Sequence, residues 1–117
     1  MGALRILIAD DHELVRRGLR SLLEIHPQWS VCAEAADGEQ AIALSKQHQP
    51  QVVLLDISMP NLNGLDAARA IRRDLPQSVI VIVSQHDSTQ MRQAATAAGA
   101  QAYIAKSQIA RDLVAEV

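Results

Sequence analysis

Polar residues directly follow apolar runs of strand length at several places in the chain, where buried strands of a sheet would reach solvent. These residues are Asp10, Asp11, Asp56, Ser84 and Lys106. Because they repeat at strand ends and are not scattered over helix faces, they indicate one pocket assembled from several segments. Two unit charges ~4 Å apart repel by about 4 kcal/mol at an effective dielectric of 20, so three carboxylates in one pocket require a cation.

Oxygen-only ligands favour Mg²⁺, with Mn²⁺ as the alternative, because these ions keep water ligands that phosphate oxygens can replace. Histidine and cysteine are absent from the expected ligand set, which disfavours zinc. A carboxylate beside such an ion can attack phosphorus and form an aspartyl phosphate, and Asp56 is the candidate nucleophile. Lys106 would then pair with the phosphoryl group, and the Ser84 hydroxyl could donate a hydrogen bond to it.

These residues must be positioned by the apolar runs that precede them. The runs expected to form strands are 4–9, 31–35, 52–55, 79–83 and 102–105. They alternate with helical patterns, and this alternation predicts a doubly wound α/β domain with a five-stranded parallel sheet. In the flavodoxin-like strand order 2-1-3-4-5, ligands bind beyond the carboxyl ends of strands one and three. That order would gather the polar residues, because neighbouring strands lie ~4.8 Å apart.

Each expected helix has a boundary signal in the sequence. A proline stops the first helix, turn-forming pairs start the second and third, and a glycine in the left-handed conformation ends the fourth, expected at about 88–98. These signals are Pro27, Asp37-Gly38, Asn63-Gly64 and Gly99. A fifth helix would begin near Gln108 and be cut short by the end of the chain.

Size and composition narrow the classes of protein. A chain of 117 residues with 49% apolar content predicts a single domain. The net charge of −2 has no basic stripe, so we expect neither nucleic-acid nor membrane binding by this segment. The single cysteine, Cys32, excludes an intrachain disulfide and fits a reducing compartment. No signal peptide or membrane-length apolar run is present, so a cytoplasmic protein is expected.

The motifs together carry a family resemblance. Ile-Ala-Asp-Asp-His at 8–12 and Leu-Leu-Asp-Ile-Ser-Met-Pro at 54–60 are followed, in order, by Gly64, Ser84, Tyr103 and Lys106. The whole chain resembles a response-regulator receiver domain of two-component signalling. It is similar in particular to the NarL/FixJ-type receivers, which are usually fused to a helix-turn-helix output domain that regulates transcription.

The resemblance implies a role for each matched residue. Asp56 would accept phosphate from a sensor histidine kinase, in a regulator that catalyses only its own phosphorylation and dephosphorylation. The implied Mg²⁺ ligands are Asp10, Asp11, Asp56 and the Ser58 backbone carbonyl. Lys106 would contact the phosphate, and side chains at Ser58 and His86 would tune dephosphorylation.

The resemblance also implies a conformational switch. Ser84 would move toward the phosphoryl group and Tyr103 would turn inward, which would change the surface of the fourth helix, fifth strand and fifth helix. The kinase would dock near the first helix, where Leu14 and Val15 flank the pocket, and activation could create a homodimer. Ser107 departs from the family pattern, because many receivers have proline after the lysine.

Other interpretations of the same residues stay open at this stage. Asp10 and Asp11 could merely cap the first helix, and the four histidines, His12 among them, are expected to be surface or cap residues. The fold could also serve as a phosphorylation-independent interaction module. An aspartyl-phosphate phosphatase is disfavoured because Ser58 stands where such enzymes commonly place a general acid. The chain stops at Val117 without an output domain, which favours a piece of a longer regulator.

Overall fold

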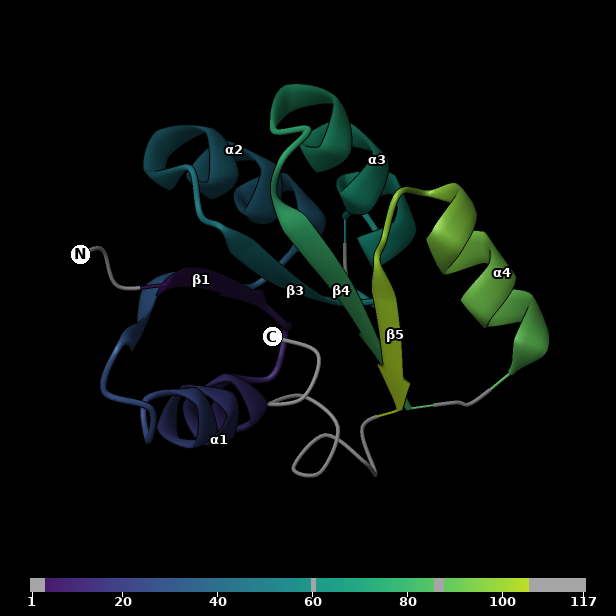
Figure 1. Cartoon of the computed structure of the whole chain (residues 1–117). Coiled ribbons are helices and arrows are strands. Elements are labelled where there is room, and N and C mark those ends of the chain that lie inside the picture. The colour runs from purple at the N-terminus through teal and green to yellow at the C-terminus, as the bar shows by residue number, and fades with distance from the viewer. Residues whose placement is uncertain (1–3, 60, 86–87, 106–117) are drawn as a thin grey trace.

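The computed structural model of the chain describes residues 4–59, 61–85 and 88–105 (Figure 1). Its strands are β1 (Leu4–Ala9), β2 (Trp29–Ala35), β3 (Val52–Asp56), β4 (Val79–Ser84) and β5 (Ala102–Ala105). Its helices are α1 (Glu13–Leu23), α2 (Gly38–His48), α3 (Gly64–Asp74) and α4 (Thr89–Ala97). The five strands are parallel in the order β2-β1-β3-β4-β5, which confirms the predicted architecture.

Helices cover both faces of the sheet, with α1 on one face and α2 and α3 on the other (Figure 1). The strand residues alternate between two apolar clusters. Leu7, Val53 and Ile80 belong to the cluster that contains α2 and α3 residues, whereas Ile8 and Leu54 belong to the cluster that contains α1 residues. This period of two on continuously apolar strands is the pattern of a sheet buried on both faces.

The predicted helix boundaries are confirmed by capping contacts. The Asp37 carboxylate accepts from the Gln40 amide at 2.8 Å, and the Asn63 side chain accepts from the Asp66 amide at 2.9 Å. Gly99 closes α4 with φ of +101°, in the region that favours glycine. Among the described residues, no helix has the length and apolar character needed to cross a bilayer.

The strand boundaries differ from the expected ones at three places. β2 begins two residues earlier, because Trp29 and Ser30 pair with the first residues of β1. β3 and β4 each extend by one residue, to Asp56 and Ser84, because Asp56 pairs with Val83, and Ser84 with a residue of β5. The expected fifth helix near Gln108 lies outside the described residues.

Candidate functional site

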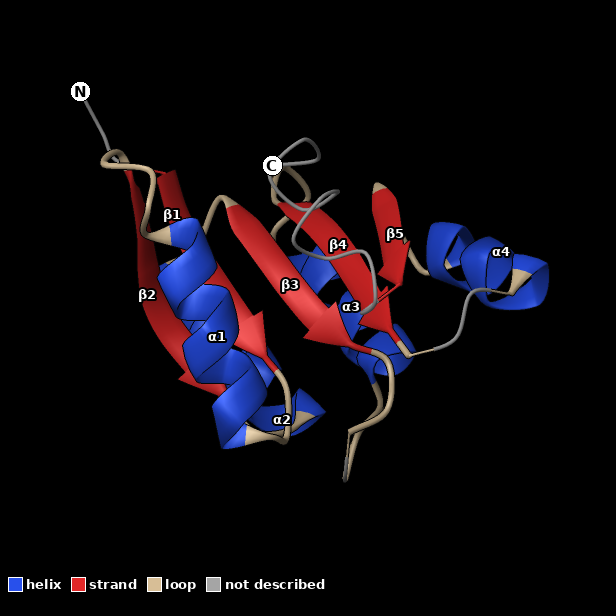
Figure 2. Cartoon of the chain, turned by 90° about the horizontal axis from the view of Figure 1, so that it is seen from below, coloured by secondary structure: helices blue, strands red, loops and turns tan. Residues whose placement is uncertain are grey.

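The carboxyl ends of β1, β3 and β4 meet at one edge of the sheet, where the arrowheads lie side by side (Figure 2). Ala9 pairs with Leu55, so the residues that follow them, Asp10 and Asp56, are neighbours across β1 and β3. Ser84 ends β4 on the other side of β3. Asp10, Asp56 and Ser84 are only 2%, 4% and 1% exposed. Two carboxylates and a hydroxyl are therefore buried at the edge where the sequence predicts the site.

Asp11 and His12 extend this group from the strand end toward α1. The His12 ring nitrogen Nδ1 lies 3.0 Å from an Asp11 carboxylate oxygen and 3.3 Å from Oδ1 of Asp10. One ligand atom from each residue lies within 4.8 Å of the other two. His12 is the N-cap residue of α1 and its side chain is 62% exposed, which confirms the expectation of a surface or cap residue, while its ring lies beside the two carboxylates. The position of His12 directly after the two aspartates in the sequence was the signal for this contact.

The capping interpretation of Asp10 and Asp11 is wrong. The N-cap residue of α1 is His12, and its side chain makes no capping hydrogen bond. Oδ1 of Asp10 instead accepts from the His12 backbone amide at 2.9 Å, two residues along the chain. Asp10 is therefore not the N-cap residue of α1, and it lies buried directly after the last residue of β1.

The loop after Asp56 is held tightly against the end of the sheet. The Ile57 amide donates to the Val83 carbonyl at 3.0 Å, and the Gly64 amide donates to the Ile57 carbonyl at 3.1 Å. A Cβ on Gly64 would overlap the Asp56 carbonyl oxygen, so glycine is required for this close approach. The Ser58 amide lies 3.4 Å from Oδ1 of Asp56. These contacts fix the backbone around Ser58 and thereby the position of the Ser58 carbonyl.

A second set of contacts joins this loop to the start of α2. Asn61 adopts a left-handed conformation with φ of +67°, and its side-chain nitrogen donates to Oδ2 of Asp37 at 2.9 Å. The bond from the Gln40 amide and the bond from Asn61 lower the pKa of Asp37 below its usual range. The sequence predicts Asp37 as a turn and cap, but the long-range bond to Asn61 has no local signal.

The lowered pKa of Asp37 leads to a pH-dependent prediction. The unfolded pKa is the higher one, so ionised Asp37 stabilises the fold above the unfolded pKa, and this stabilisation is lost as the pH falls through the folded pKa. Asp37→Ala should lower the melting temperature at neutral pH, and its difference from wild type should shrink below about pH 4. Asp37→Asn, which keeps a capping oxygen, is the control and should lose less. Calorimetric melts that show a pH-independent difference would contradict this account.

Tyr103 lies on β5, where it pairs with Ile82 of β4, two residues before Ser84. The Arg92 guanidinium carbon of α4 lies 4.9 Å from the centroid of the Tyr103 ring, a cation–π distance, and Arg92 also donates to the Tyr103 carbonyl at 3.4 Å. Tyr103 is half-buried and packs on the core cluster beneath α2, α3 and α4. Lys106 and His86 lie outside the described residues, so their assigned roles stay predictions.

The donor set fits a hard divalent cation. Buried Asp10, partly exposed Asp11 and buried Asp56 supply carboxylate oxygens at one sheet edge, and such ligands suit Mg²⁺. The imidazole of His12 lies beside two of them, but most of the donors are carboxylate oxygens, which suit Mg²⁺ and Mn²⁺ alike. The chemistry of these donors therefore agrees with the expected Mg²⁺ or Mn²⁺.

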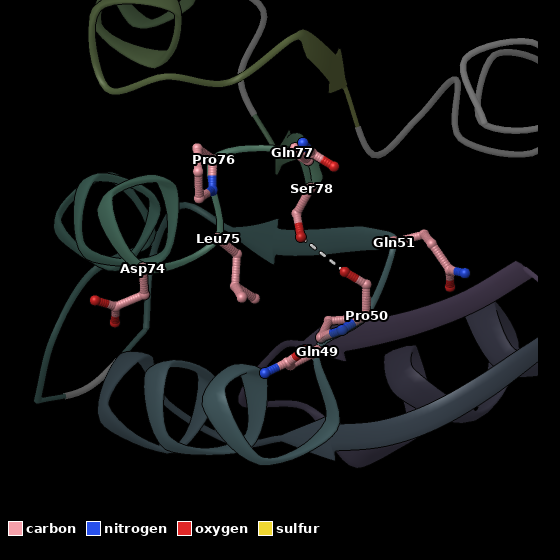
Figure 3. Close-up of a pocket in the computed structure, with 8 residues that line it drawn as sticks. All are labelled: Gln49, Pro50, Gln51, Asp74, Leu75, Pro76, Gln77 and Ser78. Carbon is pink, nitrogen blue, oxygen red and sulfur yellow. Dashed lines mark hydrogen bonds between the residues drawn. The ribbon is translucent and has the colours of Figure 1, made fainter.

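A separate pocket of about 380 Å³ lies at the opposite edge of the sheet, next to the amino ends of β3 and β4 (Figure 3). It is lined by Gln49, Pro50, Gln51, Asp74, Leu75, Pro76, Gln77 and Ser78. The Ser78 hydroxyl donates to the Pro50 carbonyl at 2.7 Å and is satisfied by that bond. None of the predicted site residues lines this pocket, so it is not the candidate site.

Comparison with known proteins gives a consistent family. Residues 6–117 match the profile of the response regulator receiver domain. The chain is 42% identical over 102 residues to the nitrate/nitrite response regulator protein NarP of Escherichia coli (strain K12), covering 87% of this chain and 47% of that protein. It is 34% identical over 114 residues to the transcriptional regulatory protein DegU of Brevibacillus brevis, covering 97% and 48%. The chain thus spans about half the length of these curated relatives.

Solved structures agree with the sequence matches. A two-component response regulator of the LuxR family from Aurantimonas sp. SI85-9A1 superposes with a TM-score of 0.92 at 36% identity, covering 97% of this chain and 81% of that one. The signal receiver domain of the putative response regulator NarL from Mycobacterium tuberculosis gives 0.88 at 32% identity, covering 98% and 96%. The likeness extends over nearly the whole chain.

Proposed function

The chain belongs to the response regulator receiver domain family, and from this membership we propose that it is a phosphorylation-dependent switch that accepts a phosphoryl group on Asp56 from a sensor histidine kinase. Response regulators are signalling proteins and not metabolic enzymes. The expected product of the reaction is a changed conformation, and the phosphoryl group is later removed by slow self-catalysed hydrolysis.

The observation that carries this proposal is the burial of Asp56 between Asp10 and Ser84 at the carboxyl edge of the sheet. An Asp56 oxygen would form the bond to phosphorus while the bond from phosphorus to the kinase histidine breaks. Burial of the carboxylate excludes bulk water, and Ser84 is one strand away, where its hydroxyl can donate to a phosphoryl oxygen.

Asp10, Asp11, Asp56 and the Ser58 carbonyl would hold Mg²⁺. When bound, this ion supplies positive charge to the phosphoryl oxygens and orients them. The role of the chain is to fix its ligands in place: the Asp10 carboxylate is held by the His12 amide, and the Ser58 backbone is held by the loop contacts of Ile57 and Gly64. Lys106 is proposed to pair with the phosphoryl group.

The proposed output is a shift between two conformations. Phosphorylation must favour the active form by about 5.5 kcal/mol to move a 1:99 population to 99:1. Ser84 and Tyr103 would couple the phosphoryl group to α4, β5 and the following helix, and the contact of Arg92 with Tyr103 would be remade in the process. We place the histidine kinase against the start of α1, where Leu14 is 78% exposed. A homodimer of receivers on activation and a DNA-binding output domain are further parts of this proposal.

Incubation with Mg²⁺ and a small acyl phosphate tests the function. We expect the intact mass to rise by one phosphoryl group, the increment to require Mg²⁺, and peptide mapping after borohydride reduction to locate it at Asp56. Stoichiometric modification without continued turnover would support a switch. Continued release of phosphate from many phosphoesters would indicate a phosphatase, and an unchanged mass in the presence of Mg²⁺ would indicate a phosphorylation-independent module.

A further inference from the structure

Arg16 of α1 contacts the backbone of Asp10, at the carboxyl end of β1. Its Nη1 donates to the carbonyl oxygen of Asp10 at 2.6 Å, the shortest of its contacts. Its Nε donates to Oε1 of Glu34 on the edge strand β2 at 3.1 Å. The Arg16 side chain is only 15% exposed. The guanidinium is therefore fixed between the end of β1, which Asp10 follows, and the edge strand β2.

Glu34 holds this arginine in place. Its second carboxylate oxygen lies 3.2 Å from Nε of Arg20, one helical turn after Arg16. One carboxylate thus links two arginines of α1 to β2. Because the fork of a guanidinium can bond two acceptors in fixed directions, Arg16 connects Glu34 to the Asp10 carbonyl as a rigid bridge.

The bridge completes the support of Asp10. The Asp10 amide donates to the Ala35 carbonyl of β2 at 3.0 Å, its carboxylate accepts from the His12 amide, and its carbonyl accepts from Arg16. The amide, the carbonyl and the carboxylate of Asp10 therefore each have a hydrogen-bond partner. Contacts of this kind behind a ligand commonly change metal affinity 10–100-fold when they are removed.

We propose that Arg16 is a positioning residue for the divalent-cation site, which holds the turn at Asp10 and Asp11 in the geometry that binds the ion. This inference rests on the proposed function. Arg16 acts through the Asp10 backbone and is not itself a ligand. The sequence does not predict this role, because an arginine on an amphipathic helix is expected to point into solvent. The role is inferred from the contacts in the structure.

Charge and positioning predict opposite results for Arg16, which makes the proposal testable. A cation near the pocket repels Mg²⁺, so loss of charge alone would tighten Mg²⁺ binding, and salt would screen this effect. Loss of positioning would weaken binding, and the weakening would persist in high salt. The direction of the change therefore separates the two roles.

The experiment is calorimetric titration of Mg²⁺ into the wild type, Arg16→Gln, Arg16→Lys and Arg17→Gln. We expect Arg16→Gln to weaken binding about tenfold at both low and high salt. Arg16→Lys, which keeps the charge but not the fork, should recover only part of this loss. Arg17→Gln is the matched control, because Arg17 is the next residue of α1, is 69% exposed and pairs only with Glu13 among the described contacts. It should bind as the wild type does, or slightly tighter.

Thermal melts of each variant separate positioning from stability. A lower melting temperature with unchanged Mg²⁺ affinity in the folded protein would overturn the proposal, as would tighter binding by Arg16→Gln. If Arg16→Gln does not fold, Glu34→Gln replaces it and is measured at high salt, where the effect of losing its own charge is screened. Weaker Mg²⁺ binding that persists at high salt would support the proposal, and unchanged affinity there would overturn it. Absence of Mg²⁺ binding by the wild type would instead contradict the metal site of the proposed function, and this inference would fall with it.

Discussion

Replacement of Asp56 with asparagine should abolish phosphorylation by a small acyl phosphate, with no phosphoryl mass increment in the time that fully modifies the wild type. Asparagine has nearly the same shape as aspartate and can still accept the bond from the Ser58 amide. It has no carboxylate oxygen to attack phosphorus. Because asparagine keeps the shape of the side chain and Asp56 is the last residue of β3, the substitution should leave the fold intact. Intact-protein mass spectrometry measures the outcome directly.

Two control variants show whether the loss of phosphorylation is specific to Asp56. Asp74→Asn makes the same chemical change at a carboxylate at the end of α3, beside the pocket at the opposite end of the sheet, and should be modified at the wild-type rate. Asp11→Asn keeps the nucleophile and removes a metal ligand, so it should be modified slowly and require more Mg²⁺. A phosphoryl group on the Asp56→Asn protein would show that another carboxylate is the acceptor and that the proposed chemistry is assigned to the wrong residue.

The fold was predictable because its strands are simple in pattern. The β-branched run of β4 and the apolar run of β3 could only be buried on both faces, and parallel order follows from the helices between strands. The ends of the strands were less predictable. Trp29 and Ser30 join β2 because β1 offers partners for them, and Asp56 joins β3 through Val83 of β4. Strand length depends on the neighbouring strand and not on the hydrophobicity of the segment itself.

The acidic residues of the site were predictable for a related reason, since strand ends in a parallel sheet must meet at one edge. Asp10, Asp56 and Ser84 are brought together as expected. The contacts of Asn61 and Arg16 with this region were not predicted from the sequence. Their contacts depend on the direction of a side chain or on a bond to a distant segment, and neither leaves a periodic pattern. Sequence thus indicates the reacting groups more readily than the groups that hold them.

Alanine at Gly64 should strongly destabilise the protein, because the backbone beside it leaves no room for a methyl group. The new Cβ would overlap the Asp56 carbonyl oxygen, and the three nearest atoms, which belong to Asp56 and Ile57, are all backbone atoms that cannot rotate away. Overpacking of this kind costs about 1–3 kcal/mol, occasionally more. Because the displaced atoms carry Asp56 and Ile57, we also expect slower phosphorylation of the protein that remains folded. Urea unfolding and the rate of mass increment measure these two effects.

Gly18 provides the matched control for this argument, because the same substitution there should have the opposite sign. Gly18 is exposed in the middle of α1, and no atom lies within 4 Å of the position that its Cβ would take. Alanine is favoured over glycine by about 0.5–1 kcal/mol inside a helix, so Gly18→Ala should raise stability and leave phosphorylation unchanged. If both variants were equally destabilised, the cost would belong to glycine replacement in general. Opposite signs would assign the cost to the contact between Gly64 of α3 and the backbone of Asp56.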